Sequence, residues 1–468
     1  MHLQPGIAAG HPATAAAGLE ILREGGSAAD AAVAASLASC VAESVMTGIA
    51  GGGHAIWWDG PKGHASHLDF FVAVPGLGAT PREVTLMDIG VPFGTELIHY
   101  AVGIASCAVP AVPAGLEELW RSHGRLPWER LCEPALALAR EGVPMPPAHV
   151  ACLAMLAPVL TLREGARIYS PHRRLLTAGE RLEQPGLVRT LEVVRAEGAH
   201  TFYEGTLADA LLALMQERDG LVTREDLLAY RPEWVEPQET DYAGIRILTR
   251  GGLSRLGDTL ARLPALRDMS PAERALTLAE ILQALPYSGR VADAGDTTNL
   301  VTADGDGNAC VLTTSLGLGS GDYLPGYDIH LNSMLGEVDL LVSQLEPGRR
   351  MESMMAPTLA SAAEGIVLAG GAAGGTRLRS ALVQVLAGIL DEGLAVQKAV
   401  DRPRLHSTGE VIHIEPGFDE SAISALLERG YEVRRWNALH HYFGGVSLIA
   451  RSGGAADPRR SGAALPLR

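Results

Sequence analysis

Cysteine, positive charge and long hydrophobic runs are scarce in this sequence. The five cysteines, Cys40, Cys107, Cys132, Cys152 and Cys310, are scattered and never spaced as C-x-x-C. Neither a disulfide framework nor a zinc site is therefore indicated, and we expect a reducing compartment. Basic residues number 38 against 54 acidic ones, and the net charge is −16. Because a surface that follows nucleic-acid phosphates needs a basic stripe, this balance argues against nucleic-acid binding.

A membrane segment and an export signal are also missing from the sequence pattern. The start MHLQPGIAAGHPATAAAG has no basic region followed by an apolar one, and no later apolar run is long enough to span a bilayer. We therefore expect a cytoplasmic protein without a membrane partner. With 468 residues, of which 47% are hydrophobic, the chain can bury a large core.

Helical patterns at both ends of the chain enclose strand-like runs. Residues 13–43 predict two helices that Gly25 and Gly26 separate, with Ser27 able to cap the second. After the loop TGIAGGG, the run HAIWWDG is strand-like, and TTNLVTAD and ACVLTTS, joined by GDGN, predict a hairpin. Strands are also expected at GIVLAGG and GVSLIAR. Further helices are predicted at 114–123, 129–140, 207–216, 376–390 and 420–429, and connections at 144–147 and 231–237.

The order of these elements favours a layered α+β fold. Strand runs with helices before and after them indicate two sheets covered by helices, in the layers α, β, β and α. No internal repeat or long low-complexity segment divides the chain.

Two threonines, Thr297 and Thr298, lie at the start of the predicted hairpin. A threonine hydroxyl is a poor nucleophile near pH 7 and needs a base beside it. A threonine that self-cleavage has made N-terminal carries such a base, because its own α-amine titrates at about 7.7 to 8.0 and is partly neutral at working pH. The pattern alone fits ordinary strand threonines equally well.

Motifs over nearly the whole chain resemble the γ-glutamyltranspeptidase family and occur in the family's order. They are AAGHPATAAAGLEILREGGSAADAAVAAS, TGIAGGG, LPWERLCEPALALAREG, TFYEGTLADAL, GLVTREDLLAY, DYAGIRI, TTNLVTADGDGNA, the glycine pair of AGGAAGGTR, and DRPRLH. The resemblance implies a self-processing hydrolase of the N-terminal-nucleophile type. It implies a four-layer αββα sandwich in one large domain and catalysis without a cofactor.

The same resemblance implies where the chain is cut. The junction is the Asp296–Thr297 bond, and Thr297 becomes the nucleophile and new N-terminus. A large subunit of residues 1–296 and a small subunit of residues 297–468 then remain together as a heterodimer. Thr298 follows directly, as in the family, and is assigned to the substrate site.

Three further positions match the family's catalytic machinery. Ser315 lies where the family has a hydroxyl that hydrogen-bonds the nucleophilic threonine. Gly374 and Gly375 match the pair whose backbone N–H groups form the oxyanion hole. Glycine permits this close backbone approach, and one such donor contributes about 2.7 to 4 kcal/mol to binding of the transition state.

The substrate side departs from the family's pattern. The family binds the α-carboxylate of glutamate with an arginine in an L-D-F-R motif, whereas this chain has LDFFVAVP with Phe71 at that position. A bidentate carboxylate clamp is thus replaced by an aromatic ring. The other assigned substrate-binding positions are Gly317 in place of an asparagine, Met334 in place of a polar residue, Glu337 for the substrate ammonium, Ser353, and Met354 in place of a second serine.

A site without these donors is expected to bind glutamate badly, so we predict weak or no γ-glutamyl transfer. The methionines and Phe71 favour a flatter or more apolar acyl group on a small-molecule substrate. Relatives in antibiotic biosynthesis clusters are assigned C–C bond hydrolysis on amino-acid-derived intermediates. The bond is therefore expected to be an amide or a C–C bond in specialised metabolism. The alternatives are a true γ-glutamyl hydrolase or transferase and an unprocessed homologue that only binds a ligand.

Other motifs carry weaker functional interpretations. The loop IVLAGGAAGGTRL lacks the G-x-G-x-x-G spacing of a dinucleotide site. Asp304, Asp306 and Asn308 resemble the opening of a calcium loop, but no glutamate follows at the required place, so a polar turn is favoured. Histidine pairs at 64 and 67 and at 440 and 441 lack the partners of a metal site. The stretch between Tyr242 and Thr297 is shorter than in the family.

Overall fold

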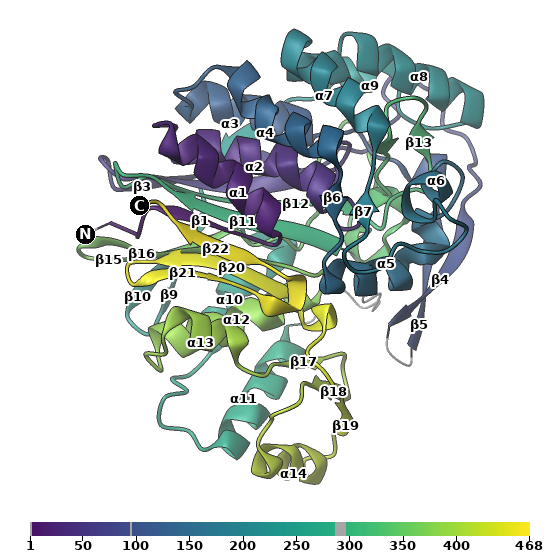
Figure 1. The fold of residues 1–468 in the computed structure, drawn as a ribbon. Helices are drawn as coiled ribbons and strands as arrows, with labels where there is room; N and C mark the ends of the chain where they lie inside the picture. Colours follow the sequence, from purple (N-terminus) through teal and green to yellow (C-terminus); the bar gives the residue numbers. More distant parts are fainter. Residues whose placement is uncertain (1, 94–95, 286–295) are drawn as a thin grey trace.

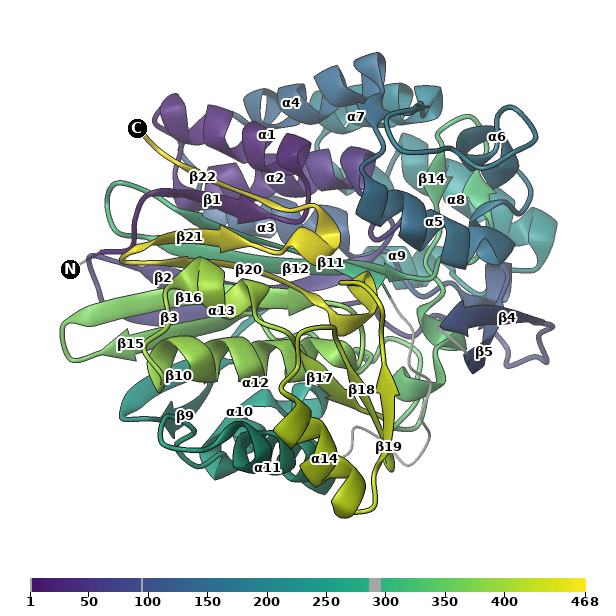
Figure 2. The same cartoon turned by 60° about the horizontal axis from the view of Figure 1, so that its bottom comes forward.

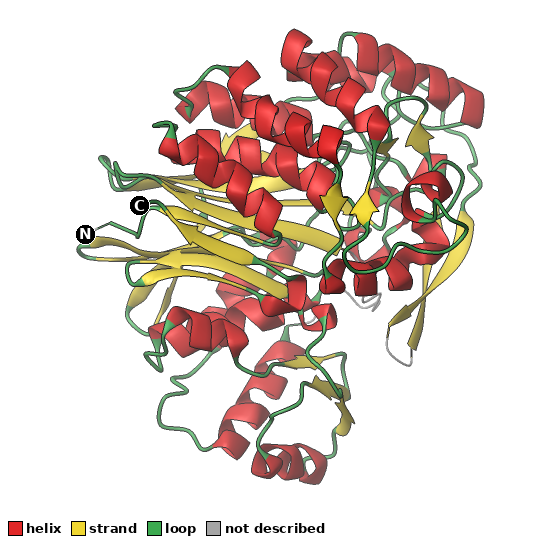
Figure 3. Ribbon diagram, in the orientation of Figure 1, coloured by secondary structure: helices red, strands yellow, loops and turns green. Residues whose placement is uncertain are grey.

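Two stacked β-sheets form the centre of the structure, and helices cover both outer faces (Figure 1, Figure 3). The computed structural model describes residues 2–93, 96–285 and 296–468. The predicted α+β sandwich with layers α, β, β and α is confirmed. The first sheet has the strand order β22 (Ala463–Pro466), β1 (Gly6–Ala9), β11 (Asp296–Ala303), β12 (Ala309–Gly317), β2 (Gly52–Asp59), β3 (His64–Phe70) and β8 (Glu233–Val235).

The second sheet packs on the first through the faces of its central strands. Its order is β21 (Gly453–Ala456), β20 (Gly445–Ala450), β16 (Gly365–Ala373), β15 (Thr358–Ala362), β10 (Ile245–Thr249) and β9 (Gln238–Tyr242). Strand β11 contacts both β16 and β20. Figure 2, turned from the view of Figure 1, shows α12 (Arg377–Leu390) in front of the strands of the second sheet. The predicted hairpin of β11 and β12 therefore lies in the middle of the molecule.

The helices divide between the outer faces of the two sheets (Figure 1). Those on the side of the first sheet are α1 (Pro12–Arg23), α2 (Ala28–Ala42), α3 (Val112–His123), α4 (Trp128–Glu141), α7 (Pro185–Glu197), α8 (Thr206–Arg218) and α9 (Arg224–Ala229). Those on the side of the second are α10 (Leu256–Arg262), α11 (Pro271–Ala284), α12 (Arg377–Leu390), α13 (Val396–Asp401) and α14 (Glu420–Glu428). Helices α5 (Pro147–Leu160) and α6 (Gly165–Tyr169) contact each other and lie beside the sheets.

Helix α2 is apolar on all sides because other elements enclose it. Every one of its residues is buried, and it contacts α1, α3 and α4 as well as β11 and β12. The predicted cap forms: Ser27 Oγ accepts a hydrogen bond from the Asp30 N–H at 3.1 Å, and the Asp30 carboxylate accepts one from the Ser27 N–H at 2.9 Å. The helix ends at Ala42, so Glu43 follows it on the inner side of the helical layer.

Small sheets and hairpins supplement the two main sheets. They are β4 (Met87–Phe93) with β5 (Glu96–Val102), β6 (Val143–Pro144) with β7 (Arg181–Leu182), β13 (Tyr323–Leu324) with β14 (Ile329–His330), and β17 (Leu405–Ser407) with β18 (Val411–Ile414) and β19 (Glu432–Arg435). The expectation of a plain connection at 231–237 is wrong, because residues 233–235 add β8 to the edge of the first sheet. Local turn residues did not reveal this pairing with a distant strand.

The turn between β11 and β12 uses Asp304 as its organising side chain. Asp304 Oδ1 accepts hydrogen bonds from the N–H groups of Asp306 and Asn308, both at 3.0 Å, and Oδ2 accepts one from the Ala28 N–H at the start of α2. Both carboxylate oxygens thus serve the turn and the helix start, as the prediction of a polar turn requires. Within the described ranges, no group of three or more potential metal-binding side chains occurs.

The described part of the chain contains no helix that is both long and apolar enough to cross a bilayer. All five cysteines lie within the described residues; they are buried, and none forms a disulfide.

Candidate active site

Thr297 is the second residue of β11, at an irregular point in the pairing with β12. Asp296 pairs with Gly317 and Thr298 pairs with Thr314, so Thr297 lies opposite two residues of the neighbouring strand. Such a bulge locally re-aims side chains and is common next to active sites. Thr297 is buried, with 4% of its surface exposed. For Asp296, the structure describes the backbone but not the side chain.

Thr297 lines a cavity of about 10 Å³ at the junction of the two sheets. Besides Thr298 and Asn299 of the same strand, the lining includes Gly10, Glu43 and Met46 from the helical side, Ala373 and Gly445 from the second sheet, and Asp457 and Arg460 near the C-terminus. A guanidinium group and two carboxylates are thus gathered around the predicted nucleophile.

Gly374 and Gly375 form the loop between β16 and α12, directly after the cavity residue Ala373. Their φ angles are +124° and +56°, a region that side chains disfavour. A Cβ on Gly374 would also lie 3.0 Å from the Cα of Gly444. The loop precedes the N-terminus of α12, where the helix dipole favours negative charge. The predicted oxyanion residues therefore directly follow a residue that lines the same cavity as the predicted nucleophile.

Ser315 occupies the bulged part of β12 opposite Thr297. Its Oγ accepts a hydrogen bond from the Gly317 N–H at 2.9 Å. On its other side Ser315 pairs with Gly52, and a Cβ on Gly51 would lie only 2.1 Å from the Ser315 carbonyl oxygen. The glycines of TGIAGGG thus let that loop approach the backbone beside the predicted nucleophile.

Glu337 and Gly317 face each other in a buried, polar contact. Glu337 Oε1 accepts a hydrogen bond from the Leu318 N–H at 3.1 Å. A Cβ at Gly317, where φ is +68°, would lie 2.1 Å from this same oxygen. With Glu337 in this position, residue 317 therefore has no room for a side chain. Burial, strengthened by the charge of Asp339, raises the pKa of Glu337 to about 8, although the Leu318 N–H and Arg377 act to lower it.

Phe71 follows β3 and is packed into the core. Its side chain is 1% exposed and stacks on the His54 ring, with centroids 5.6 Å apart and planes inclined by 16°. The Phe71 carbonyl accepts hydrogen bonds from the Tyr230 hydroxyl and from Arg350 Nη1, both at 2.8 Å. The position of the Phe71 ring is therefore fixed by its packing against His54.

Two arginines approach the Phe71 region, and protein groups engage both. The Arg350 guanidinium also donates to the Arg231 carbonyl at 2.6 Å and lies over the Tyr230 ring at 4.7 Å. Arg250 Nη1 donates to the carbonyls of Gly251 and Ser353. Both guanidinium groups are thus held by acceptors of the protein itself.

The remaining predicted substrate positions are buried. Met334 and Met354 are 1% and 8% exposed. Ser353 is 1% exposed, and its Oγ accepts a hydrogen bond from the Met355 N–H at 3.2 Å. Thr298, which was also assigned to the substrate site, donates its hydroxyl to Glu43 Oε2 at 2.5 Å. Its substrate role stays a prediction.

Glu43 was missed at the level of sequence. It is fully buried and accepts hydrogen bonds from the hydroxyls of Thr298 and Thr14, the latter at 2.7 Å. The sequence signal that could have identified it is a single carboxylate at the end of an alanine-rich helix, shortly before the loop TGIAGGG. A buried charge needs such partners, and the two hydroxyls provide them.

A buried ion network lies behind the loop of Gly374 and Gly375. Arg404 Nη1 donates to the Gly444 carbonyl at 3.2 Å, and Arg404 Nη2 binds Asp457 Oδ2 at 2.6 Å. Asp457 also binds Arg459 at 3.1 Å, and Arg459 is paired with Glu415. Because Gly444 packs against Gly374, the network fixes the backbone around that glycine. Arg404 of the motif DRPRLH is thus part of a buried ion-pair network.

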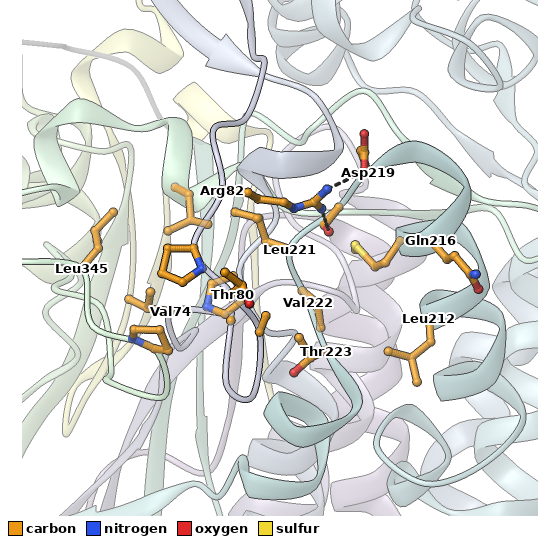
Figure 4. A pocket seen from close by; sticks show the side chains of 18 residues that line it. Val74, Thr80, Arg82, Leu212, Gln216, Asp219, Leu221, Val222, Thr223 and Leu345 are labelled. Carbon is orange, nitrogen blue, oxygen red and sulfur yellow. Dashed lines mark hydrogen bonds and ion pairs between the residues drawn. The ribbon is translucent and has the colours of Figure 1, made fainter.

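A separate cavity of about 700 Å³ lies between residues 74–82, the end of α8 and residues 335–347 (Figure 4). At its rim Arg82 pairs with Asp219 and donates to the Gly220 carbonyl. None of the predicted catalytic residues lines it, although Leu335 follows Met334 directly. This cavity is thus distinct from the one that Thr297 lines.

Known proteins match this chain over almost its whole length. The family model described as gamma-glutamyltranspeptidase matches residues 14–285 and 268–467. The acylase ACY 1 proenzyme of Pseudomonas sp. (strain V22) is 29% identical, over 95% of this chain and 89% of its own length. The glutathione hydrolase proenzyme of Bacillus subtilis (strain 168) is 26% identical, over 98% and 91%. The crystal structure of cephalosporin acylase from Bacillus halodurans matches with a TM-score of 0.81 and 25% identity, over 99% and 96%.

Proposed function

The chain belongs to the gamma-glutamyltranspeptidase family, and from this premise we propose that it is a hydrolase that cuts itself before Thr297 and then uses Thr297 as its nucleophile. The products are a large subunit of residues 1–296 and a small subunit of residues 297–468, held together as a heterodimer. The two relatives named above are proenzymes, which supports a maturation step. Their hydrolytic activity supports the reaction class.

The position of Thr297 carries this proposal. It lies at the bulged start of a central strand, with the Ser315 backbone on one side and the loop of Gly374 and Gly375 close by. In the cleaved protein its α-amine takes the hydroxyl proton while Oγ attacks a substrate carbonyl. The N–H groups of the two glycines then stabilise the oxyanion, and water releases the acyl group.

We propose that the substrate is not a γ-glutamyl compound. Phe71 supplies a packed ring where the family has the glutamate-binding arginine, and the nearby Arg350 and Arg250 are bound to backbone carbonyls. Together with the buried Met334 and Met354, this arrangement favours a flat or apolar acyl group. The bond is an amide, or a C–C bond beside a carbonyl when the leaving carbanion is stabilised. Such a substrate suits a role in specialised metabolism.

Self-cleavage is tested by intact-mass measurement and denaturing gel electrophoresis of the purified protein. We expect two fragments that separate between Asp296 and Thr297, and a single full-length chain for Thr297→Ala. Thr298→Ser, which keeps the hydroxyl that Glu43 accepts, is the matched control and is expected to be cleaved. A wild-type chain that stays whole and inert would instead support an unprocessed homologue that only binds a ligand.

The substrate class is tested with two chromogenic anilides, one γ-glutamyl and one arylacetyl. We expect turnover of the aryl compound and near-background turnover of the γ-glutamyl compound, both lost in Thr297→Ala. Rapid γ-glutamyl turnover would overturn the argument from Phe71 and identify a true γ-glutamyl hydrolase or transferase.

A further inference from the structure

Self-cleavage poses a chemical problem that the mature reaction does not. Before the cut, the nitrogen of Thr297 belongs to the Asp296–Thr297 peptide bond, and an amide nitrogen is not a base near neutral pH. The hydroxyl proton of Thr297 must therefore go to a different group while the chain is whole. The residues that line the cavity at Thr297 are the candidates for this base.

Two carboxylates line this cavity, those of Glu43 and Asp457. Asp457 is bound by Arg404 at 2.6 Å and by Arg459 at 3.1 Å. Burial acts to raise the pKa of Asp457, but the two guanidinium groups outweigh it and hold this pKa below its ordinary value. Asp457 is therefore a weak base whose role is to hold the ion network.

Glu43 is differently placed. It follows α2, is fully buried, and is oriented by the hydroxyls of Thr298 at 2.5 Å and Thr14 at 2.7 Å. The hydrogen bond from Thr298 links it to the residue directly after the nucleophile. A Cβ on Gly10 would lie 2.7 Å from Glu43 Oε2. A side chain at position 10 would therefore collide with this oxygen, and glycine avoids that collision.

The cavity that Glu43 shares with Thr297 has a volume of about 10 Å³, close to the roughly 10 to 15 Å³ that one water molecule needs. Its walls offer hydroxyls, carboxylates and the Arg460 guanidinium, which are the polar partners that a buried water requires. One bridging water can thus connect the Thr297 hydroxyl with Glu43.

We propose that Glu43 is the base for self-cleavage and acts on Thr297 through one bound water. The Thr297 Oγ loses its proton through this water to Glu43 and bonds to the carbonyl carbon of Asp296. The C–N bond then breaks, and the nitrogen takes the proton back from Glu43 to become the free amine. A second water hydrolyses the ester, which leaves the Asp296 carboxylate and regenerates the Thr297 hydroxyl.

The pH dependence of this step depends on the other titratable and charged groups near Glu43. Cys40, one helical turn earlier, stays a neutral thiol because burial, aided by Glu43, raises its pKa to about 12. His11, next to Gly10, is neutral near pH 7 because burial lowers its pKa to about 4. The Arg460 guanidinium lines the same cavity, and the guanidinium groups of Arg404 and Arg459 hold the pKa of Asp457 below its ordinary value. The acid limb of self-cleavage is therefore expected to report protonation of Glu43.

The inference rests on the proposed self-cleavage and is tested on full-length chains made by cell-free synthesis, with cleavage followed on denaturing gels from pH 5 to 9. Glu43→Gln keeps the size and one acceptor oxygen, and we expect cleavage about 100-fold slower, without the acid limb. Glu43→Asp keeps a carboxylate and is expected to restore part of the rate and the acid limb. Asp391→Asn, which neutralises a buried carboxylate at the far end of α12, is the matched control and is expected to cleave normally.

The outcomes separate the two proposals. A wild-type chain that is never cleaved would overturn the proposed function and this inference together. Cleavage of Glu43→Gln at the wild-type rate, with an unchanged pH profile, would overturn only the role of Glu43. Thermal melting of each chain identifies a variant that fails to fold. In that case Glu43→Asp decides: cleavage at the wild-type rate without an acid limb would contradict the proposal.

Discussion

Replacing Glu337 by glutamine is expected to remove a pH-dependent loss of stability. Burial raises the pKa of Glu337 in the folded chain to about 8, above the ordinary value of 4.5. Between these values the unfolded chain releases the proton while the folded chain keeps it. The folded state binds more protons, so its stability is highest at low pH and falls as the pH rises through this window.

The size of the effect follows from the two pKa values. One pKa unit corresponds to about 1.4 kcal/mol, so the whole window from 4.5 to about 8 amounts to about 5 kcal/mol, and the part above pH 5 to about 4 kcal/mol. Glutamine preserves the acceptor for the Leu318 N–H but has no proton to lose. An unfolding entropy of about 1 kcal/mol/K for a chain of this length converts 4 kcal/mol into roughly 4 °C.

The assay is the midpoint of thermal unfolding at pH 5 and pH 8.5. Both chains carry Thr297→Ala, so that each unfolds as a single uncut chain. We expect the midpoint of Glu337→Gln, measured relative to the parent, to rise by about 4 °C between the two pH values. Parallel pH profiles for the two chains would refute the reasoning and show that Glu337 ionises normally in the folded state.

Three further substitutions test other parts of the site, and a fourth, at the exposed Arg435, serves as a control. Gly317→Ala is expected to cost about 1 to 3 kcal/mol, because its Cβ would meet Glu337 Oε1 at 2.1 Å and its φ is +68°; an unchanged melting temperature would contradict this. Arg404→Met is expected to cost about 3 to 5 kcal/mol by leaving part of a buried ion network unpaired. Arg435→Met, which removes an exposed pair with Glu420, should cost less than about 1 kcal/mol, and equal melting shifts would disprove the contrast. Phe71→Arg is expected to lower stability without creating γ-glutamyl anilide turnover, because the site is packed against His54; a tenfold gain in that turnover would show that the single residue sets specificity.

The hairpin of β11 and β12, the capped helix α2 and the strand before Gly374 were predictable because each depends on local signals. Alternation of apolar residues, a serine cap and turn residues act over a few positions of the chain. Strand β8 was not predictable, because residues 233–235 become a strand only by pairing with β3 at the sheet edge. The family and the layered fold, both inferred from motifs in order, are confirmed.

The sequence by itself determined which residue is the candidate nucleophile, because Thr297 and the glycine pair occur in recognisable motifs. It also marked Phe71 as a departure on the substrate side. Only the tertiary structure placed Glu43 beside Thr297 and gave Glu337 its raised pKa. Those properties depend on burial and on neighbours that are distant in the chain, such as Thr298 for Glu43 and Leu318 for Glu337. Residue identity and local spacing do not encode the desolvation that decides where a proton resides.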